Sequence, residues 1–135
     1  MKKPIILVAD DEKDARSAVV SFLRQRFDCD FNEVSDGEEA VEFVKRNPCD
    51  VILLDIKMPR KSGITVIKES KEIDPDIDII IVSAWISENV SGEAMKIGAS
   101  DYLIKPVNLT ALSMKLSAIL DKRGQLINKT WDSGQ

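Results

Sequence analysis

The chain has 135 residues, the length of one ordinary domain with a single core. Its 44% hydrophobic and 31% charged residues indicate a globular protein, and a net charge of −4 without a block of Lys or Arg argues against direct binding of nucleic acid. No stretch approaches the roughly 18–20 apolar residues of a membrane span, and the run Ile5–Ala9 is too short for a signal peptide, so we expect a cytoplasmic protein without membrane contact.

Five short strands are predicted, separated by amphipathic stretches. The first, third and fourth are continuous apolar runs, which is typical of parallel strands buried on both faces. The second and fifth are weaker. In chain order the predicted strands are Ile5–Ala9, Asp30–Val34, Val51–Leu54, Ile79–Val82 and Tyr102–Ile104.

A helical period of apolar residues follows each strand. Ser35-Asp36-Gly37-Glu38 has the spacing of a capping box before the second helix, Gly98 stands where a C′ glycine belongs after the fourth, and Asn108 can cap the fifth. The alternation predicts an α/β fold: a doubly wound, five-stranded parallel sheet built as (βα)5, with helices on both faces. The helical pattern fades after the fifth helix, so we predict one domain over residues 1–123 and a polar tail or linker stub over 124–135.

Charged and polar residues stand where the strands end. Asp10 and Asp11 follow the first strand and Asp55 the third, while Ser83 ends the fourth and Lys105 follows the fifth. Open parallel sheets bind ligands at the carboxyl ends of their strands, where the strand order reverses, and in a flavodoxin-like order 2-1-3-4-5 that point lies between strands one and three. Alone, each residue is more often a solvated turn, cap or surface residue. Their joint placement indicates a site.

Three converging carboxylates repel one another, and a hard divalent cation such as Mg²⁺ relieves that repulsion. A metal, an ammonium and a hydroxyl around one carboxylate suit phosphoryl transfer with Asp55 as the nucleophile. The chain has no histidine, so no histidine of its own can act as general base, metal ligand or phosphohistidine. Another molecule must therefore supply the phosphoryl group. The two cysteines, Cys29 and Cys49, lack metal-ligand spacing and are interpreted as reduced, partly buried thiols.

With these motifs the chain resembles a receiver domain of bacterial two-component response regulators, over about residues 4–122. The segments that carry the resemblance are the acidic pair Asp10-Asp11, the run Val51–Asp55 with Ile56-Lys57-Met58-Pro59 and Gly63, the end of the fourth strand through Ser83-Ala84, and Gly98–Pro106. Each segment alone is moderately specific for this family. The four segments together, in this order and at this spacing, are highly specific for it.

The resemblance implies a role for each matching residue in the metal site. Asp55 is then the phosphorylated aspartate, Asp11 a direct ligand of Mg²⁺ or Mn²⁺, and Asp10 a ligand that acts largely through metal-bound water. The backbone carbonyl of Lys57 would be the third protein ligand. Lys57 and Trp85 also occupy variable family positions that flank the path of the attacking water, and Trp85 should lie near the phosphoryl group.

The resemblance also implies a switch. The Ser83 hydroxyl would meet a phosphoryl oxygen together with Lys105, whose peptide bond to Pro106 is expected to be cis, and Tyr102 would be the aromatic switch residue. The implied partners are a histidine kinase or a histidine phosphotransfer protein. A second copy of the chain or a downstream effector would bind through the surface of the fourth helix, fifth strand and fifth helix, about Glu88–Ile97 and Tyr102–Leu120. Such a domain catalyses its own phosphorylation and dephosphorylation and is not a metabolic enzyme.

Three other kinds of protein share some of these features. A pseudo-receiver would keep the fold and bind partners without phosphorylation, but a degenerate receiver usually loses one of the five site residues. An aspartate-dependent phosphohydrolase of the haloacid dehalogenase type would carry Asp-x-Asp after its first strand, whereas the nucleophile candidate here reads Asp55-Ile56-Lys57. A flavin site would need a Ser/Thr/Gly-rich phosphate loop after the first strand, where this chain has acids.

Overall fold

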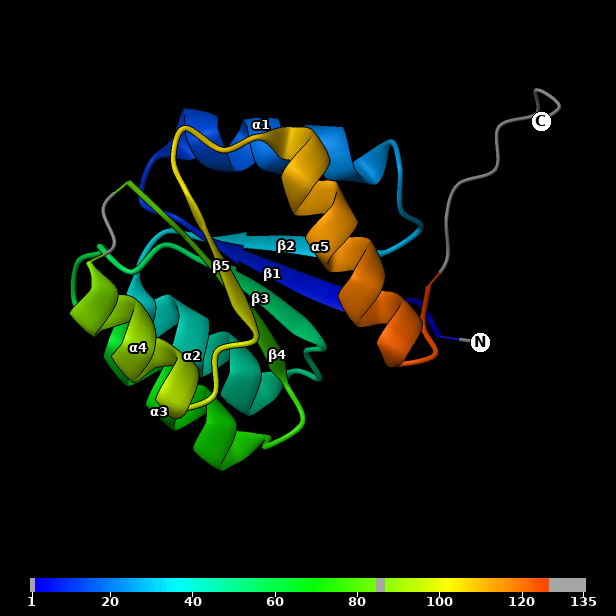
Figure 1. Ribbon diagram of the computed structural model, residues 1–135. Helices are drawn as coiled ribbons and strands as arrows, with labels where there is room; N and C mark the ends of the chain where they lie inside the picture. Colours follow the sequence, from blue (N-terminus) through cyan, green and yellow to red (C-terminus); the bar gives the residue numbers. More distant parts are fainter. Residues whose placement is uncertain (1, 85–86, 127–135) are drawn as a thin grey trace, which may run out of the picture.

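Five strands and five helices alternate along the chain (Figure 1). The structure is a computed structural model that describes residues 2–84 and 87–126. The strands are β1 (Ile5–Ala9), β2 (Asp30–Val34), β3 (Val51–Leu54), β4 (Asp78–Ser83) and β5 (Asp101–Ile104). The helices are α1 (Lys13–Arg24), α2 (Gly37–Arg46), α3 (Gly63–Ile73), α4 (Glu88–Lys96) and α5 (Leu109–Lys122). The first three strands have the predicted bounds, β4 extends one residue beyond the prediction at each end, and β5 begins one residue earlier than predicted.

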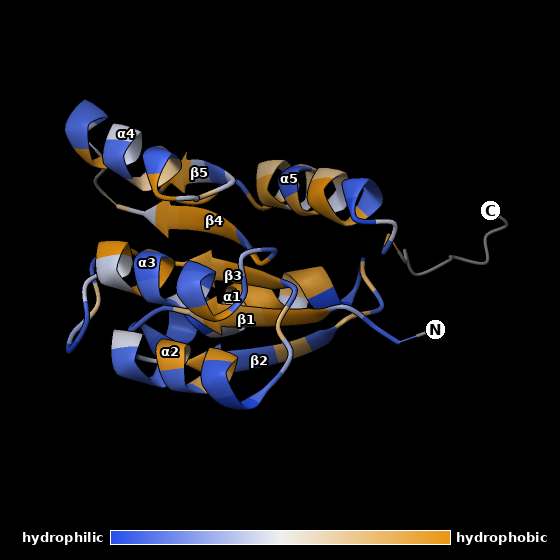
Figure 2. Ribbon diagram, turned by 90° about the horizontal axis from the view of Figure 1, so that it is seen from below, coloured by the Kyte–Doolittle hydropathy of each residue, from blue (hydrophilic) through white to orange (hydrophobic). Residues whose placement is uncertain are grey.

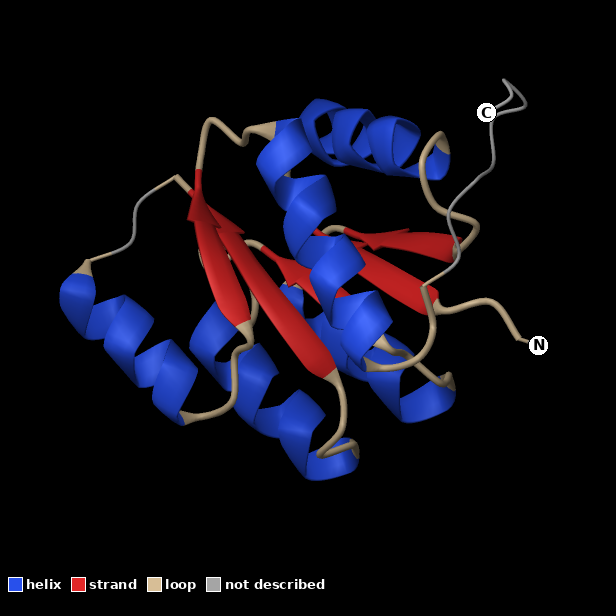
Figure 3. Cartoon of the chain, turned by 45° about the vertical axis from the view of Figure 1, so that its right-hand side comes forward, coloured by secondary structure: helices blue, strands red, loops and turns tan. Residues whose placement is uncertain are grey.

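The strands form one parallel sheet in the order β2-β1-β3-β4-β5, which confirms the predicted doubly wound fold. Helices α1 and α5 cover one face of this sheet, and α2, α3 and α4 cover the other (Figures 1 and 3). The order reverses between β1 and β3, whose ends are level because Ala9 pairs with Leu54. The residues that follow these two strands therefore lie side by side at the carboxyl edge of the sheet.

The inner strands β1, β3 and β4 are largely hydrophobic (Figure 2). Their side chains alternate between two apolar layers, one on each face of the sheet. On β1, for example, Leu7 and Ala9 join the layer under α2, α3 and α4, whereas Ile6 and Val8 join the layer under α1 and α5. Within the part of the chain that the structure describes, no helix is long and apolar enough to cross a membrane.

The helix starts and ends follow the predicted signals, with one correction. Asn108 caps α5 by accepting from the Ala111 N–H, and Gly98 follows α4 with a φ of +122°. Before α2, however, the N-cap is Asp36, which accepts from the Glu39 N–H at 2.8 Å. The capping pair thus lies one residue later than the Ser35–Glu38 spacing, because the helix begins at Gly37 and Asp caps as well as Ser.

Candidate functional site

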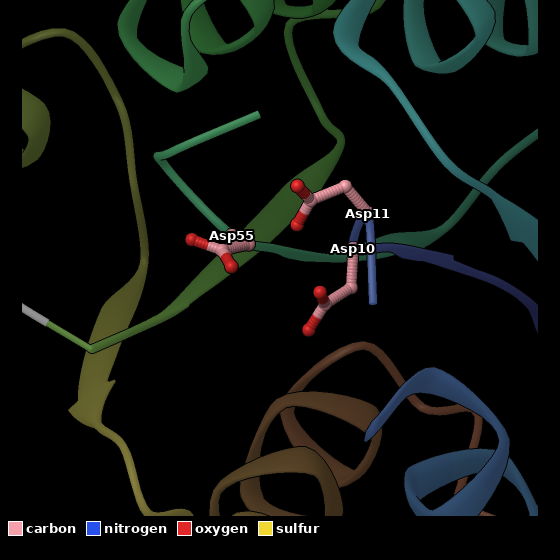
Figure 4. Close-up of side chains that lie close together, drawn as sticks. All are labelled: Asp10, Asp11 and Asp55. Atoms are coloured by element: carbon pink, nitrogen blue, oxygen red, sulfur yellow. The ribbon is translucent and has the colours of Figure 1, made fainter. Parts of the chain in front are cut away.

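Three aspartates gather at the carboxyl edge of the sheet, as Figure 4 shows. Asp10 and Asp11 leave the end of β1, and Asp55 directly follows β3. One carboxylate oxygen from each lies within 4.8 Å of the others. The Asp55 N–H donates to the Ala9 carbonyl at 3.0 Å and so extends the β1–β3 pairing by one step. This pairing brings Asp55 to the acidic pair, although 44 positions separate it from Asp11 in the sequence.

Lys105 bridges two of these carboxylates. Its ammonium Nζ lies 2.7 Å from Asp10 Oδ2 and 3.0 Å from Asp55 Oδ2. The lysine follows β5 and its N–H donates to the Ser83 carbonyl at 2.8 Å, while its peptide bond to Pro106 is cis, as the resemblance implies. Burial by itself would lower the pKa of Lys105, but the hydrogen bonds to Asp10 and Asp55 outweigh it and raise the pKa above its ordinary value.

Backbone amides orient the other oxygens of the same two carboxylates. The Glu12 N–H donates to Asp10 Oδ1 at 2.9 Å, and the Lys57 N–H donates to Asp55 Oδ1 at 3.0 Å. Each of these two carboxylates is therefore held by one amide and by the shared ammonium. Sequence reasoning did not include Arg16, whose guanidinium donates to the Asp10 carbonyl at 2.7 Å and fixes the end of β1 from α1. No motif marks this arginine, since its role depends on where α1 lies against β1.

The cluster suits a hard divalent cation. Asp10 and Asp55 are only 8% and 7% exposed, whereas Asp11 is exposed and gives solvent access to the cluster. The Lys105 ammonium pairs with Asp10 and Asp55, and Asp11 adds a third carboxylate, so the cluster is rich in the anionic oxygen donors that Mg²⁺ and Mn²⁺ prefer. Asp10, Asp11 and Asp55 are the residues that could hold such an ion.

Ser83 and Tyr102 occupy the neighbouring strands β4 and β5. Ser83 ends β4 and is fully buried, and its hydroxyl has no hydrogen-bond partner within the described ranges 2–84 and 87–126. A buried hydroxyl without a partner is uncommon in folded proteins and is available to an incoming acceptor. Tyr102 lies on the edge strand β5, is 40% exposed, and pairs with Ile81, two residues before Ser83. Lys57 is exposed, and Trp85 lies outside the described residues.

A cavity of about 270 Å³ opens beside the acids, between α1 and α5. Its polar end is lined by Asp10, Asp55, Lys105 and Arg16. The remainder is apolar and formed by side chains such as Val19 and Leu112 from the two helices. The acids are therefore reached both from solvent at Asp11 and from the side of α1 and α5.

Comparison with known proteins places these features in a family. The response regulator receiver domain family matches residues 6–117. The chain is 33% identical over 129 residues to Transcriptional regulatory protein CiaR of Streptococcus pneumoniae, covering 96% of this chain and 57% of that protein. It is 35% identical over 108 residues to Regulatory protein LuxO of Vibrio cholerae, covering 80% of this chain and 24% of that protein. The solved receiver domain of the Francisella response regulator 1452 is 30% identical, with a TM-score of 0.80 and coverage of 90% of this chain and 99% of that one.

The chain belongs to the response regulator receiver domain family of two-component systems, which confirms the resemblance found in its sequence. The fold agrees with this family, since the parallel α/β structure matches a solved receiver domain. The chain spans 57% and 24% of the two longer relatives. What those relatives do beyond their receiver domains is therefore a separate question for this chain.

Proposed function

We propose that this chain accepts a phosphoryl group on Asp55 from a histidine kinase or a histidine phosphotransfer protein. The observation that carries this proposal is the Asp55 carboxylate itself, which is 7% exposed, is held between the Lys57 N–H and the Lys105 ammonium, and lies beside Asp10 and Asp11. An oriented carboxylate with cationic support is what an aspartate nucleophile needs.

In the proposed reaction an Asp55 carboxylate oxygen bonds to phosphorus while the bond from phosphorus to the donor's imidazole nitrogen breaks. The electron pair stays on that nitrogen, which takes a proton from solvent. Asp10, Asp11, Asp55 and the backbone carbonyl of Lys57 would hold Mg²⁺ or Mn²⁺, which when bound supplies positive charge to the phosphoryl oxygens. Water later hydrolyses the acyl phosphate and restores the Asp55 carboxylate.

Two further side chains would bind the transferred group. Lys105 already contacts Asp55 at 3.0 Å and would move its ammonium to a phosphoryl oxygen. The unpartnered hydroxyl of Ser83 would donate to another oxygen. The movement of Ser83 would leave space for Tyr102 and so change the surface formed by α4, β5 and α5.

Through that surface we expect the signal to reach another chain, either a second copy or a separate effector. Large apolar side chains are exposed on its three elements, including Met95, Tyr102, Ile104 and Met114. Relatives named as transcriptional regulators extend beyond the part that this chain matches, so an output domain attached to the same chain is a further candidate for this contact. The domain limit at residue 123 and the cytoplasmic location stay predictions.

The proposal is tested by intact-protein mass spectrometry after incubation with Mg²⁺ and acetyl phosphate. We expect one acid-labile phosphoryl adduct on the native chain and on Asp121→Asn, a change in an exposed residue of α5, and none on Asp55→Asn. An adduct on Asp55→Asn at the native rate would refute Asp55 as the acceptor. No adduct on the native chain would favour the pseudo-receiver, in which the same fold binds partners without phosphorylation.

A further inference from the structure

The loop between β3 and α3 is attached to the start of α2, about twenty residues earlier in the chain. The Gly37 N–H donates to the Pro59 carbonyl at 3.3 Å. The Arg60 guanidinium pairs with Asp36 at 3.3 Å and with Glu38 at 3.7 Å. The far side of the loop is thus bonded to the first turn of α2 by backbone and side chains.

The contact between these segments leaves no room for a side chain at Gly37. A Cβ there would lie 2.3 Å from the Lys61 carbonyl oxygen and 2.6 Å from the Lys61 Cβ. Real Cβ contacts are essentially never this short, and the nearest atom belongs to the backbone. Any larger residue at position 37 would therefore displace the loop.

Backbone conformation holds the rest of the loop. Arg60 has a φ of +74°, a region that favours glycine and is uncommon for other residues. The Gly63 N–H donates to the Ile56 carbonyl at 2.9 Å, and a Cβ at Gly63 would lie 2.5 Å from the Ile56 Cα. The loop is therefore closed at its base as well as attached at its far side.

This loop carries one of the two groups that orient Asp55, since the Lys57 N–H donates to Asp55 Oδ1 at 3.0 Å. We propose that Gly37 and Arg60 are positioning residues of the phosphorylation site: they hold the loop so that the backbone of Lys57 orients the Asp55 carboxylate. Among the residues that the structure describes, neither Gly37 nor Arg60 forms a hydrogen bond or ion pair with the three site aspartates. The expected effect on metal binding rests on the proposed function, in which Asp55 and the Lys57 carbonyl are ligands.

The first test measures Mg²⁺ affinity by isothermal titration calorimetry. We expect Gly37→Ala to weaken Mg²⁺ binding about tenfold. This is the lower end of the loss of metal affinity that follows when groups that orient metal ligands are changed. The matched control is Gly92→Ala in α4, where a Cβ meets no atom within 4 Å, and its affinity should equal that of the native chain. Equal affinities of Gly37→Ala and Gly92→Ala would overturn the inference.

A second pair of variants covers the case in which Gly37→Ala does not fold. Arg60 has a side chain that is 65% exposed, so its replacement leaves the core intact. Arg60→Gly and Arg60→Val both lose the ion pairs, but only glycine accepts the positive φ without cost. We expect Arg60→Gly to keep Mg²⁺ affinity closer to the native value than Arg60→Val. Equal affinities of the two variants would overturn the role of the Arg60 backbone.

The Lys57 amide signal in a ¹H–¹⁵N NMR spectrum, recorded without metal, separates this inference from the proposed function. It should shift in Gly37→Ala and Arg60→Val and stay in place in Gly92→Ala, because the first two changes displace its hydrogen bond to Asp55. If the native chain binds no Mg²⁺ but the two loop variants show these shifts, only the proposed metal site is refuted. An unshifted Lys57 amide in both loop variants would refute the positioning role.

Discussion

Lys105 shows how one residue sets the charge of the site. Its pKa is raised, although burial alone would lower it, because hydrogen bonds to Asp10 and Asp55 favour the ammonium. A group whose pKa is higher in the folded protein stabilises it fully below the unfolded pKa, and that stabilisation is lost as pH rises through the higher folded pKa. The bridge is therefore complete at neutral pH and weakens only in the alkaline range above the ordinary lysine pKa.

The two thiols give a prediction at the same scale. Burial, reinforced by the charge of Asp28 beside Cys29 and of Asp50 beside Cys49, raises the pKa of each to about 12 from the usual 9.0. Because the thiolate is the reactive form, a rise of about three pKa units lowers its fraction about a thousandfold at pH 8. We expect both thiols to react very slowly with 5,5′-dithiobis(2-nitrobenzoic acid) in the native protein. In guanidinium chloride both should react at once, and a native thiol reacting at the unfolded rate would contradict the prediction.

At the scale of elements, α5 is anchored at the amino edge of the sheet. Arg123, at its end, contacts Asp50 before β3 at 3.0 Å and Asp78 at the start of β4 at 2.9 Å. Gln125 adds a hydrogen bond to Asp50 at 3.1 Å, and the Ile5 N–H donates to the same carboxylate at 2.8 Å. Arg123 thereby joins the helix to the starts of β3 and β4, and the Asp50 carboxylate extends the link to the start of β1.

We expect Arg123→Met to lower the free energy of unfolding by about 1–2 kcal/mol, because hydrogen bonds between charged groups are worth about 1.5–3 kcal/mol and these are partly screened by solvent. The measurement is a urea titration in which the midpoint falls while the slope stays constant. Arg46→Met is the matched control, since Arg46 pairs with Glu42 on the exposed face of α2 and should contribute about 0.5 kcal/mol or less. Equal losses in the two variants would contradict the anchoring role.

The proposed switch also belongs to the scale of elements, because it links β4 to β5 and α4. Ser83→Ala should still take phosphoryl at Asp55, since the nucleophile and Lys105 remain. With Mg²⁺ and a beryllofluoride phosphoryl mimic, amide exchange in the native chain should change in α4 and around Tyr102, and in Ser83→Ala it should not. Changes confined in the native chain to the loops around Asp11 and Asp55 would refute the switch.

At the scale of the whole molecule, metal binding should raise global stability, since an ion that binds only the folded state stabilises it by RT ln(1 + [L]/Kd). At a hundredfold excess of Mg²⁺ over Kd the gain is about 2.7 kcal/mol, which calorimetry would record as a Tm higher by several degrees. Asp11→Ala should remove most of this gain, and Asp121→Ala should keep it. A full gain in Asp11→Ala would place the ion elsewhere.

Without metal, Asp55→Asn should be slightly more stable than the native chain, because it relieves carboxylate repulsion.

Much of this fold could be predicted from local patterns. The first three strands have the predicted bounds because their residue types and the polar segments around them mark where each can begin and end. Most residues of the candidate site stand at or just after the end of a strand, which is why the sequence singles them out, and the structure brings Asp10, Asp11, Asp55 and Lys105 together. Their roles in phosphoryl transfer stay predictions. The strand order itself came from resemblance to known folds, because a parallel sheet leaves no local signal of which strands are neighbours.

The sequence by itself determined which elements form, which residues stand at the carboxyl edge, and that these 135 residues contribute no histidine to the site. Only the tertiary structure decided which of these groups touch: Lys105 bridges Asp10, 95 positions away, and Asp55, 50 positions away. The contact of Gly37 with Lys61 and the bond from Arg16 to the Asp10 carbonyl likewise had no sequence signal. The physical reason is that periodicity and capping report interactions between residues close in sequence, whereas these contacts depend on strand order, register and the path of each loop.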